Sequence, residues 1–209
     1  MNDDLQRKGT VTVAISLTVN VFLAGLKLIV GFTCFSQALV ADGIHSLVDI
    51  AGDVAALIGL RLAHLPKDED HPYGHHRFST LAALLISSLV LLFCLGLAWQ
   101  SLSGLVSGAA VKKPELAAAW VAGAALVIKE IFYQFARRQA ERLGSRLLMA
   151  NAADHRADAI ASFLALVAVV VANVHPEWVA VDKVVGLVLA GWLGAEGIRL
   201  FKGACLDLI

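Results

Sequence analysis

The sequence predicts an all-α, polytopic membrane protein built as a bundle of six transmembrane helices. Of its 209 residues, 58% are hydrophobic and only 16% are charged, and the mean hydropathy is +0.75. Ordinary soluble domains carry about 25% charged residues. Six apolar stretches also reach the roughly 20 residues that a helix needs to cross the hydrocarbon core of a bilayer. They cover residues 10–32, 36–63, 78–105, 114–137, 145–173 and 179–201.

The connections between these spans are polar or contain residues that end helices. Gly31 and the TCFS segment after it separate the first two spans, and LPKDEDHPYGHHR (65–77) joins the second span to the third. Only GACLDLI follows Lys202, which is too short for a folded domain. We therefore expect residues 1–209 to form a single transmembrane domain with no C-terminal soluble domain.

The charge distribution predicts the orientation and excludes one class of partner. The chain has 17 basic and 17 acidic residues, so it lacks the basic excess that predicts binding to nucleic acid. The basic residues outside the spans gather on the side that holds both chain ends. Because cytoplasmic loops carry an excess of Lys and Arg, we expect a multi-pass protein of the cell membrane with both termini in the cytoplasm.

An internal repeat links the second and fifth spans. Shifting the chain by 109 positions aligns SQALVADGIHSLVDIAGDVAAL (36–57) with SRLLMANAADHRADAIASFLAL (145–166), with six identities in 22 positions. The two copies lie three spans apart, so they cross the membrane in opposite directions. This pattern indicates an inverted repeat, an architecture in which transporters bind their substrate near the membrane midplane.

Four ionisable residues in these copies predict a metal site. His45 and Asp49, and likewise Asp154 and Asp158, are four residues apart and share one helix face. One imidazole and three carboxylates suit a divalent ion such as Zn²⁺, Fe²⁺, Mn²⁺, Co²⁺ or Cd²⁺. Each uncompensated carboxylate at membrane depth would cost at least ~2.5 to 3.5 kcal/mol. Bound cations or protons must therefore balance them, unless neighbouring helices or water satisfy each group separately.

Other polar residues in the spans have less specific roles. Asp42 and Asp53 extend the stripe that contains Asp49 and could line the path to the site. His155 points about 100° away from Asp154 on a helix, so we expect it to make a packing contact or to support a ligand. Four further charges inside the spans are expected to pair or to reach the membrane surface; they are Lys27, Lys129, Glu130 and Arg156.

The loop between the second and third spans holds a second group of potential ligands. Asp68, His71 and His75 lie there within eight residues, next to Pro72 and Gly74, which favour a turn. Such a turn could bring the side chains together around a metal ion at the cytoplasmic surface. A solvated, charged loop without metal is the alternative.

Motifs along nearly the whole chain resemble the cation diffusion facilitator family of divalent-metal transporters. The segments that carry the resemblance are GFTCFSQALVADGIHSLVDI, LPKDEDHPYGHHRFSTLAAL, IKEIFY, SRLLMANAADHRADAIAS and VDKVVGLVLAG. Because no C-terminal domain follows the last span, the chain is similar to the short subgroup of that family.

The resemblance implies cation efflux, in which Zn²⁺ or a related ion (Cd²⁺, Fe²⁺ or Mn²⁺) leaves the cytoplasm by proton antiport. It implies a homodimer in the membrane lipid, with the metal ion as substrate, protons as counter-ion and no prosthetic group. His45, Asp49, Asp154 and Asp158 would be the transport site, and Asp68, His71 and His75 a loop site found in some members. Zinc-transporting members commonly have His at the position of Asp154, so this departure leaves the choice of metal open.

A metal-dependent membrane phosphotransferase is the alternative function. Small six-helix enzymes of that class also carry paired Asp residues, but they require a DGxxAR segment. Here Asp42 and Gly43 are followed by IHSL, with no Ala-Arg pair. We therefore expect a transporter, not an enzyme, and no catalytic residues.

Overall fold

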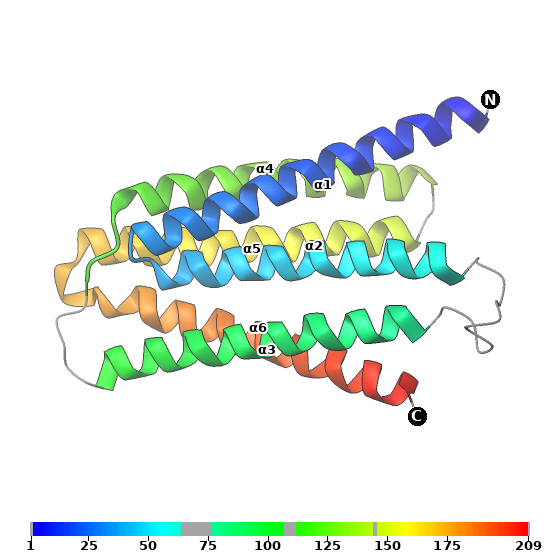
Figure 1. Cartoon of the computed structure of the whole chain (residues 1–209). Coiled ribbons are helices and arrows are strands. Elements are labelled where there is room, and N and C mark those ends of the chain that lie inside the picture. The colour runs from blue at the N-terminus through cyan, green and yellow to red at the C-terminus, as the bar shows by residue number, and fades with distance from the viewer. Residues whose placement is uncertain (1, 64–76, 107–111, 144–145, 209) are drawn as a thin grey trace.

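Six long helices form the bundle in the computed structural model, which describes residues 2–63, 77–106, 112–143 and 146–208. The helices are α1 (Asn2–Thr33), α2 (Gln37–Ala63), α3 (Arg77–Val106), α4 (Leu116–Leu143), α5 (Arg146–Val174) and α6 (Ala180–Leu208). A short 3₁₀ turn, η1 (Pro176–Trp178), joins α5 to α6 (Figure 1). The predicted all-α fold is confirmed. The first helix begins earlier and the last ends later than the apolar spans, because helices continue past the hydrocarbon boundary.

The helices have the length and composition of a multi-pass membrane protein. Among the described residues, four helical segments are long and apolar enough to cross a bilayer: Ala83–Val106, Leu116–Arg142, Ala152–Val174 and Ala180–Leu206. A shorter apolar segment covers Leu17–Thr33 in α1. Within α2 the continuous run of described side chains, residues 37–51, is shorter than the length required of a membrane-spanning segment.

The helices pack mainly as three neighbouring pairs: α1 with α2, α4 with α5, and α3 with α6 (Figure 1). In addition, α2 contacts α3, α5 and α6 and so occupies a central position. Alanines fill the contact region between α4 and α5, among them Ala118, Ala122, Ala165 and Ala168. Such small residues let membrane helices approach closely, where packing rather than hydrophobic burial drives association.

The packing agrees with the inverted repeat except at one interface. The α1–α2 pair in the first half corresponds to the α4–α5 pair in the second. However, α2 packs on α6, whereas the described parts of α3 and α5 hardly touch. The two halves therefore have similar internal packing but different contacts across the bundle. In inverted-repeat transporters, alternating access moves one repeat against the other around a fixed site.

The start of α2 is fixed tightly at the end of the bundle away from the two chain ends. Asp182 on α6 accepts hydrogen bonds from Ser36 Oγ and from the Gln37 backbone N–H, both at 2.7 Å. A Cβ on Gly186 would lie 3.0 Å from the Gln37 backbone carbon. Ser101 on α3 also donates to Gln37 Oε1 at 2.7 Å. These contacts hold α2, α3 and α6 together at this end.

Candidate metal centre

Three of the four residues predicted from the repeat converge between α2 and α5. The His45 Nε2 atom lies 3.8 Å from Asp158 Oδ1 and 4.0 Å from Asp49 Oδ2. One ligand atom from each of the three side chains lies within 4.8 Å of the others. Two ligands of a tetrahedral ion with bonds near 2.1 Å are roughly 3.4 Å apart. Small side-chain rotations would therefore bring these donors around a divalent ion.

The two oxygen atoms of the Asp158 carboxylate lie in different environments. Its Oδ2 atom accepts a hydrogen bond from the ammonium of Lys129 on α4. Its Oδ1 atom faces His45, is buried, and has no hydrogen-bond partner among the described residues. Leaving such an acceptor unsatisfied costs about 1–3 kcal/mol, and more for a charged group. A cation bound between Asp158 and His45 would remove this penalty.

Exposure increases along α2 from Asp42 to Asp49. The side chain of Asp42 is 0% exposed, that of His45 is 12% exposed and that of Asp49 is 40% exposed. Charged groups at membrane depth face a water-filled cavity or other protein groups. The site is therefore accessible from the end of the bundle where α2 ends and α5 begins, which is also where α1 begins and α6 ends (Figure 1).

The fourth predicted ligand lies outside this group. Asp154 is one turn before Asp158 on α5, and its side chain is exposed. The structure thus brings together His45, Asp49 and Asp158 and leaves Asp154 closer to the open end. The predicted loop site, Asp68, His71 and His75, lies outside the described residues. The side chain of Asp53 is not described either.

A buried polar cluster closes the other side of the site. The Lys27 ammonium lies 2.9 Å from Asp42 Oδ2 and donates to Ser46 Oγ at 3.1 Å. Ser162 Oγ on α5 donates to the same Asp42 oxygen at 2.8 Å. All four residues are at most 2% exposed. The cluster ties α1, α2 and α5 together next to His45.

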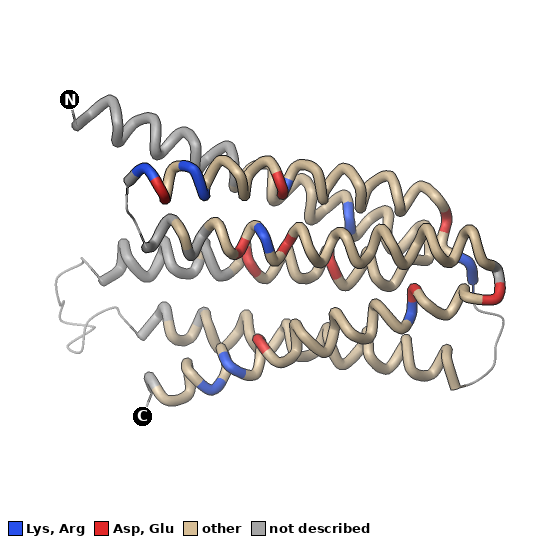
Figure 2. Tube along the Cα trace, turned by 180° about the vertical axis from the view of Figure 1, so that it is seen from behind, with Lys and Arg blue, Asp and Glu red and all other residues tan. Residues whose placement is uncertain are grey.

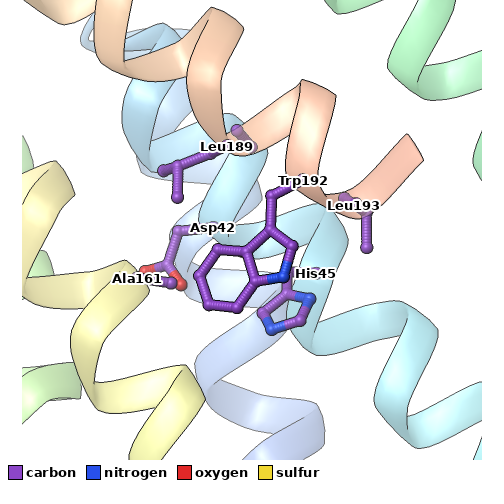
Figure 3. Close-up of a pocket in the computed structure, with 7 residues that line it drawn as sticks. Asp42, His45, Ala161, Leu189, Trp192 and Leu193 are labelled. Carbon is purple, nitrogen blue, oxygen red and sulfur yellow. The ribbon is translucent and has the colours of Figure 1, made fainter. Parts of the chain in front are cut away.

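A small cavity separates this cluster from the imidazole. It has a volume of about 10 Å³ and is bounded on α2 by Asp42 and His45 and on α6 by Trp192 (Figure 3). The Trp192 and His45 rings are 5.9 Å apart between centroids. About 10–15 Å³ on this scale holds one water molecule. Leu189, Trp192 and Leu193 form the α6 wall of this cavity.

The four further charges named from the sequence, Lys27, Lys129, Glu130 and Arg156, are all paired. Arg156 NH1 lies 2.5 Å from Glu130 Oε2, which links α5 to α4 close to the Lys129–Asp158 pair. Charges thus occur in the middle of the bundle as well as at its ends (Figure 2). His155 is buried and stacks on Phe132 with a centroid distance of 5.8 Å, so it packs between α4 and α5.

Two neighbours of the site were not identified from the sequence. Ser162 is four residues after Asp158, so helix periodicity places both on one face, and this spacing could have identified it. Trp192 comes from α6, and no local pattern relates it to His45. Its position depends on how α6 packs against α2.

A bundle of apolar helices with a carboxylate and imidazole cluster at membrane depth defines a membrane transporter for cations. Residues 13–209 match the family model described as the cation efflux transmembrane domain. The chain belongs to the cation efflux family. This confirms the resemblance to the cation diffusion facilitators, and it makes the chain a transporter of divalent metal cations, not an enzyme.

Several curated relatives are similar over most of this chain. The manganese efflux system protein MneS of Bacillus subtilis is 36% identical over 199 residues, which cover 95% of this chain and 68% of the relative. Metal tolerance protein C1 of Arabidopsis thaliana is 36% identical, covering 93% of this chain and 44% of the relative. Mitochondrial metal transporter 1 of Saccharomyces cerevisiae is 31% identical, covering 92% and 42%. The chain thus spans less than half the length of the plant and yeast relatives.

Proposed function

We propose that the chain exports a divalent transition-metal ion from the cytoplasm in exchange for protons, and that His45, Asp49, Asp154 and Asp158 bind the ion. The observation that carries this proposal is the buried Oδ1 atom of Asp158, which faces His45 and lacks a hydrogen-bond partner in the described structure. A divalent cation supplies the missing partner. Asp154 follows the same helix face one turn closer to the open end.

Zn²⁺ and Mn²⁺ are the two leading substrates in this proposal. The resemblance to zinc exporters favours Zn²⁺, which binds imidazole and carboxylate well. Three carboxylates against one imidazole form an oxygen-rich set, which suits Mn²⁺. Two relatives from Bacillus subtilis, at 36% and 30% identity, are named manganese efflux proteins. Fe²⁺ and Cd²⁺ are less favoured substrates, and the flux assay described below includes them.

Protons are the proposed counter-ion because they compete with the metal for the same atoms. Metal binding requires a neutral imidazole and ionised carboxylates, so protonation of the ligands releases the ion. Transport then requires the site to open to each side in turn. With both termini in the cytoplasm, the exposed side chains of Asp49 and Asp154 lie toward the cytoplasm. The Lys27–Asp42 cluster and Asp182 lie on the closed, outward side.

Three further features belong to the same proposal. All four ligands are carried by α2 and α5, so the transmembrane domain alone performs the transport step. The protein acts in the cell membrane as a homodimer. Asp68, His71 and His75 form a secondary metal site that gathers ions at the cytoplasmic surface.

Metal flux into proteoliposomes tests the proposal. Zn²⁺, Mn²⁺, Fe²⁺ and Cd²⁺ are supplied separately to liposomes with and without an acidic interior. We expect uptake of Zn²⁺ or Mn²⁺ that is stimulated by the proton gradient and is lost in Asp49→Ala, while the variant elutes as a folded protein. Uptake of Zn²⁺ and Mn²⁺ by Asp49→Ala at the rate of the unmodified protein would refute the site. Equal uptake rates with and without the proton gradient would refute proton exchange.

A further inference from the structure

Two lysines are fully buried inside the described bundle, and only one of them contacts the metal centre. Lys27 is 0% exposed and pairs with Asp42 on the closed side. Lys129 is 1% exposed and donates to Asp158 Oδ2. A charged ammonium is rare at membrane depth unless it is paired and functional. The role of Lys129 therefore needs an explanation that includes its position on a metal ligand.

Lys129 and the metal ion share one carboxylate. The two oxygens of Asp158 are joined through a single carbon, so a cation at Oδ1 and an ammonium at Oδ2 lie close together. Both carry positive charge at the buried end of the site, where Lys129 and Asp158 are 1% and 5% exposed and charges interact more strongly than in water. Lys129 holds Oδ1 toward His45 in the empty site, and it repels the ion once the ion is bound.

Anchoring α5 to α4 does not by itself account for Lys129. Arg156 and Glu130 already connect the same two helices at 2.5 Å, in a pair whose side chains are 50% and 35% exposed. The Arg156–Glu130 pair therefore joins the two helices without burying a charge. A neutral donor at position 129 would also satisfy Asp158 Oδ2. Unlike a neutral donor, a cation at position 129 also places a positive charge next to the transport site.

The formal charges of the ligands and lysines show how Lys129 changes the affinity of the site for a divalent ion. The four proposed ligands carry three negative charges with neutral imidazole, and the Lys27–Asp42 pair is neutral overall. Lys129 reduces the negative charge of the ligand set from three to two, while Glu196 on α6 adds a further negative charge that acts on Asp49. Without Lys129 the loaded site would carry one more negative charge and would retain the ion more strongly.

We propose that Lys129 is a positioning residue that also sets the affinity of the transport site, a tethered cation that positions Asp158 in the empty site and weakens the binding of a divalent ion enough for release. This inference rests on the proposed transport function. It assigns to α4 a role that the four ligands on α2 and α5 do not include.

Metal affinity of the purified full chain tests the inference. Lys129→Gln removes the charge and keeps a donor, Lys129→Arg keeps the charge, and Arg156→Gln is the control that removes a cation from the neighbouring α4–α5 pair. Mn²⁺ and Zn²⁺ binding is measured by calorimetry in detergent, and KM and kcat are measured in proteoliposomes. We expect Lys129→Gln to bind at least tenfold more tightly, equivalent to about 1.4 kcal/mol, with a lower KM and a lower kcat.

Control variants distinguish an effect of the Lys129 charge on metal binding from an effect on folding. Lys129→Arg is expected to bind within about threefold of the unmodified protein because it keeps the buried positive charge. Arg156→Gln is expected to do the same because its ion pair is exposed and contributes little. A folded Lys129→Gln protein with unchanged or weaker affinity would show that Lys129 only anchors Asp158. If neither Lys129→Gln nor Lys129→Met yields a folded protein, the ammonium is a structural requirement and the inference is also overturned.

A further variant separates this inference from the proposed function. Asp49→Asn should lose Mn²⁺ and Zn²⁺ binding, because it removes a ligand without touching Lys129. Normal binding by Asp49→Asn would refute the transport site itself. Lost binding in Asp49→Asn together with unchanged binding in Lys129→Gln would refute only the role of Lys129.

Discussion

Removing the ammonium of Lys27 should destabilise the bundle strongly. Lys27→Met keeps an unbranched side chain of similar length but leaves the Asp42 carboxylate buried without a cation. Both side chains are 0% exposed, and Asp42 Oδ1 already has no hydrogen-bond partner in the described part of the chain. Breaking a buried ion pair by removing one partner costs about 3–5 kcal/mol. In a protein of this size that corresponds to a decrease in Tm of roughly 6 to 20 °C.

Thermal unfolding of the detergent-purified chain measures this effect. The control is the double variant Lys27→Met with Asp42→Asn, which removes both charges and keeps an acceptor for Ser162. Because no charge is left unpaired, the double variant should recover most of the lost stability. If Lys27→Met unfolds at the temperature of the unmodified protein, or if the double variant is no more stable than the single one, the buried pair does not act as described.

Three further predictions concern the packing at the closed end and are tested by the same thermal measurement. Asp182→Ala should destabilise by about 1–2 kcal/mol, because the backbone N–H of Gln37 loses its acceptor; an unchanged Tm would contradict this. Gly186→Ala should also destabilise, since its Cβ would lie 3.0 Å from backbone, whereas Gly191→Ala has free space and should be neutral or slightly stabilising. Equal effects of these two alanines would contradict the close approach. Phe35 has φ of 58°, so Phe35→Gly should be more stable than Phe35→Ala by about 1 kcal/mol, and the reverse order would refute backbone strain there.

The helices and the candidate ligands could be predicted from the sequence because both depend on local periodicity. Apolar length predicts where a helix crosses the bilayer, and the observed helices fall on the six predicted stretches. A spacing of four residues places His45 and Asp49 on one face whatever the rest of the chain does. Their counterparts in α5 followed from the repeat, and the structure places Asp158 next to His45.

The position of each helix relative to its neighbours could not be predicted in this way. The packing of small residues between helices sets their rotation and depth, and those contacts join residues far apart in sequence. Only the folded arrangement shows that Lys129 occupies one oxygen of Asp158, that Lys27 neutralises Asp42, and that Asp154 stays outside the three-residue group. The sequence by itself determined which ionisable groups lie at membrane depth and which face of a helix they share. Tertiary structure decided which charges meet and which remain available for an ion, because those pairings depend on contacts across the bundle.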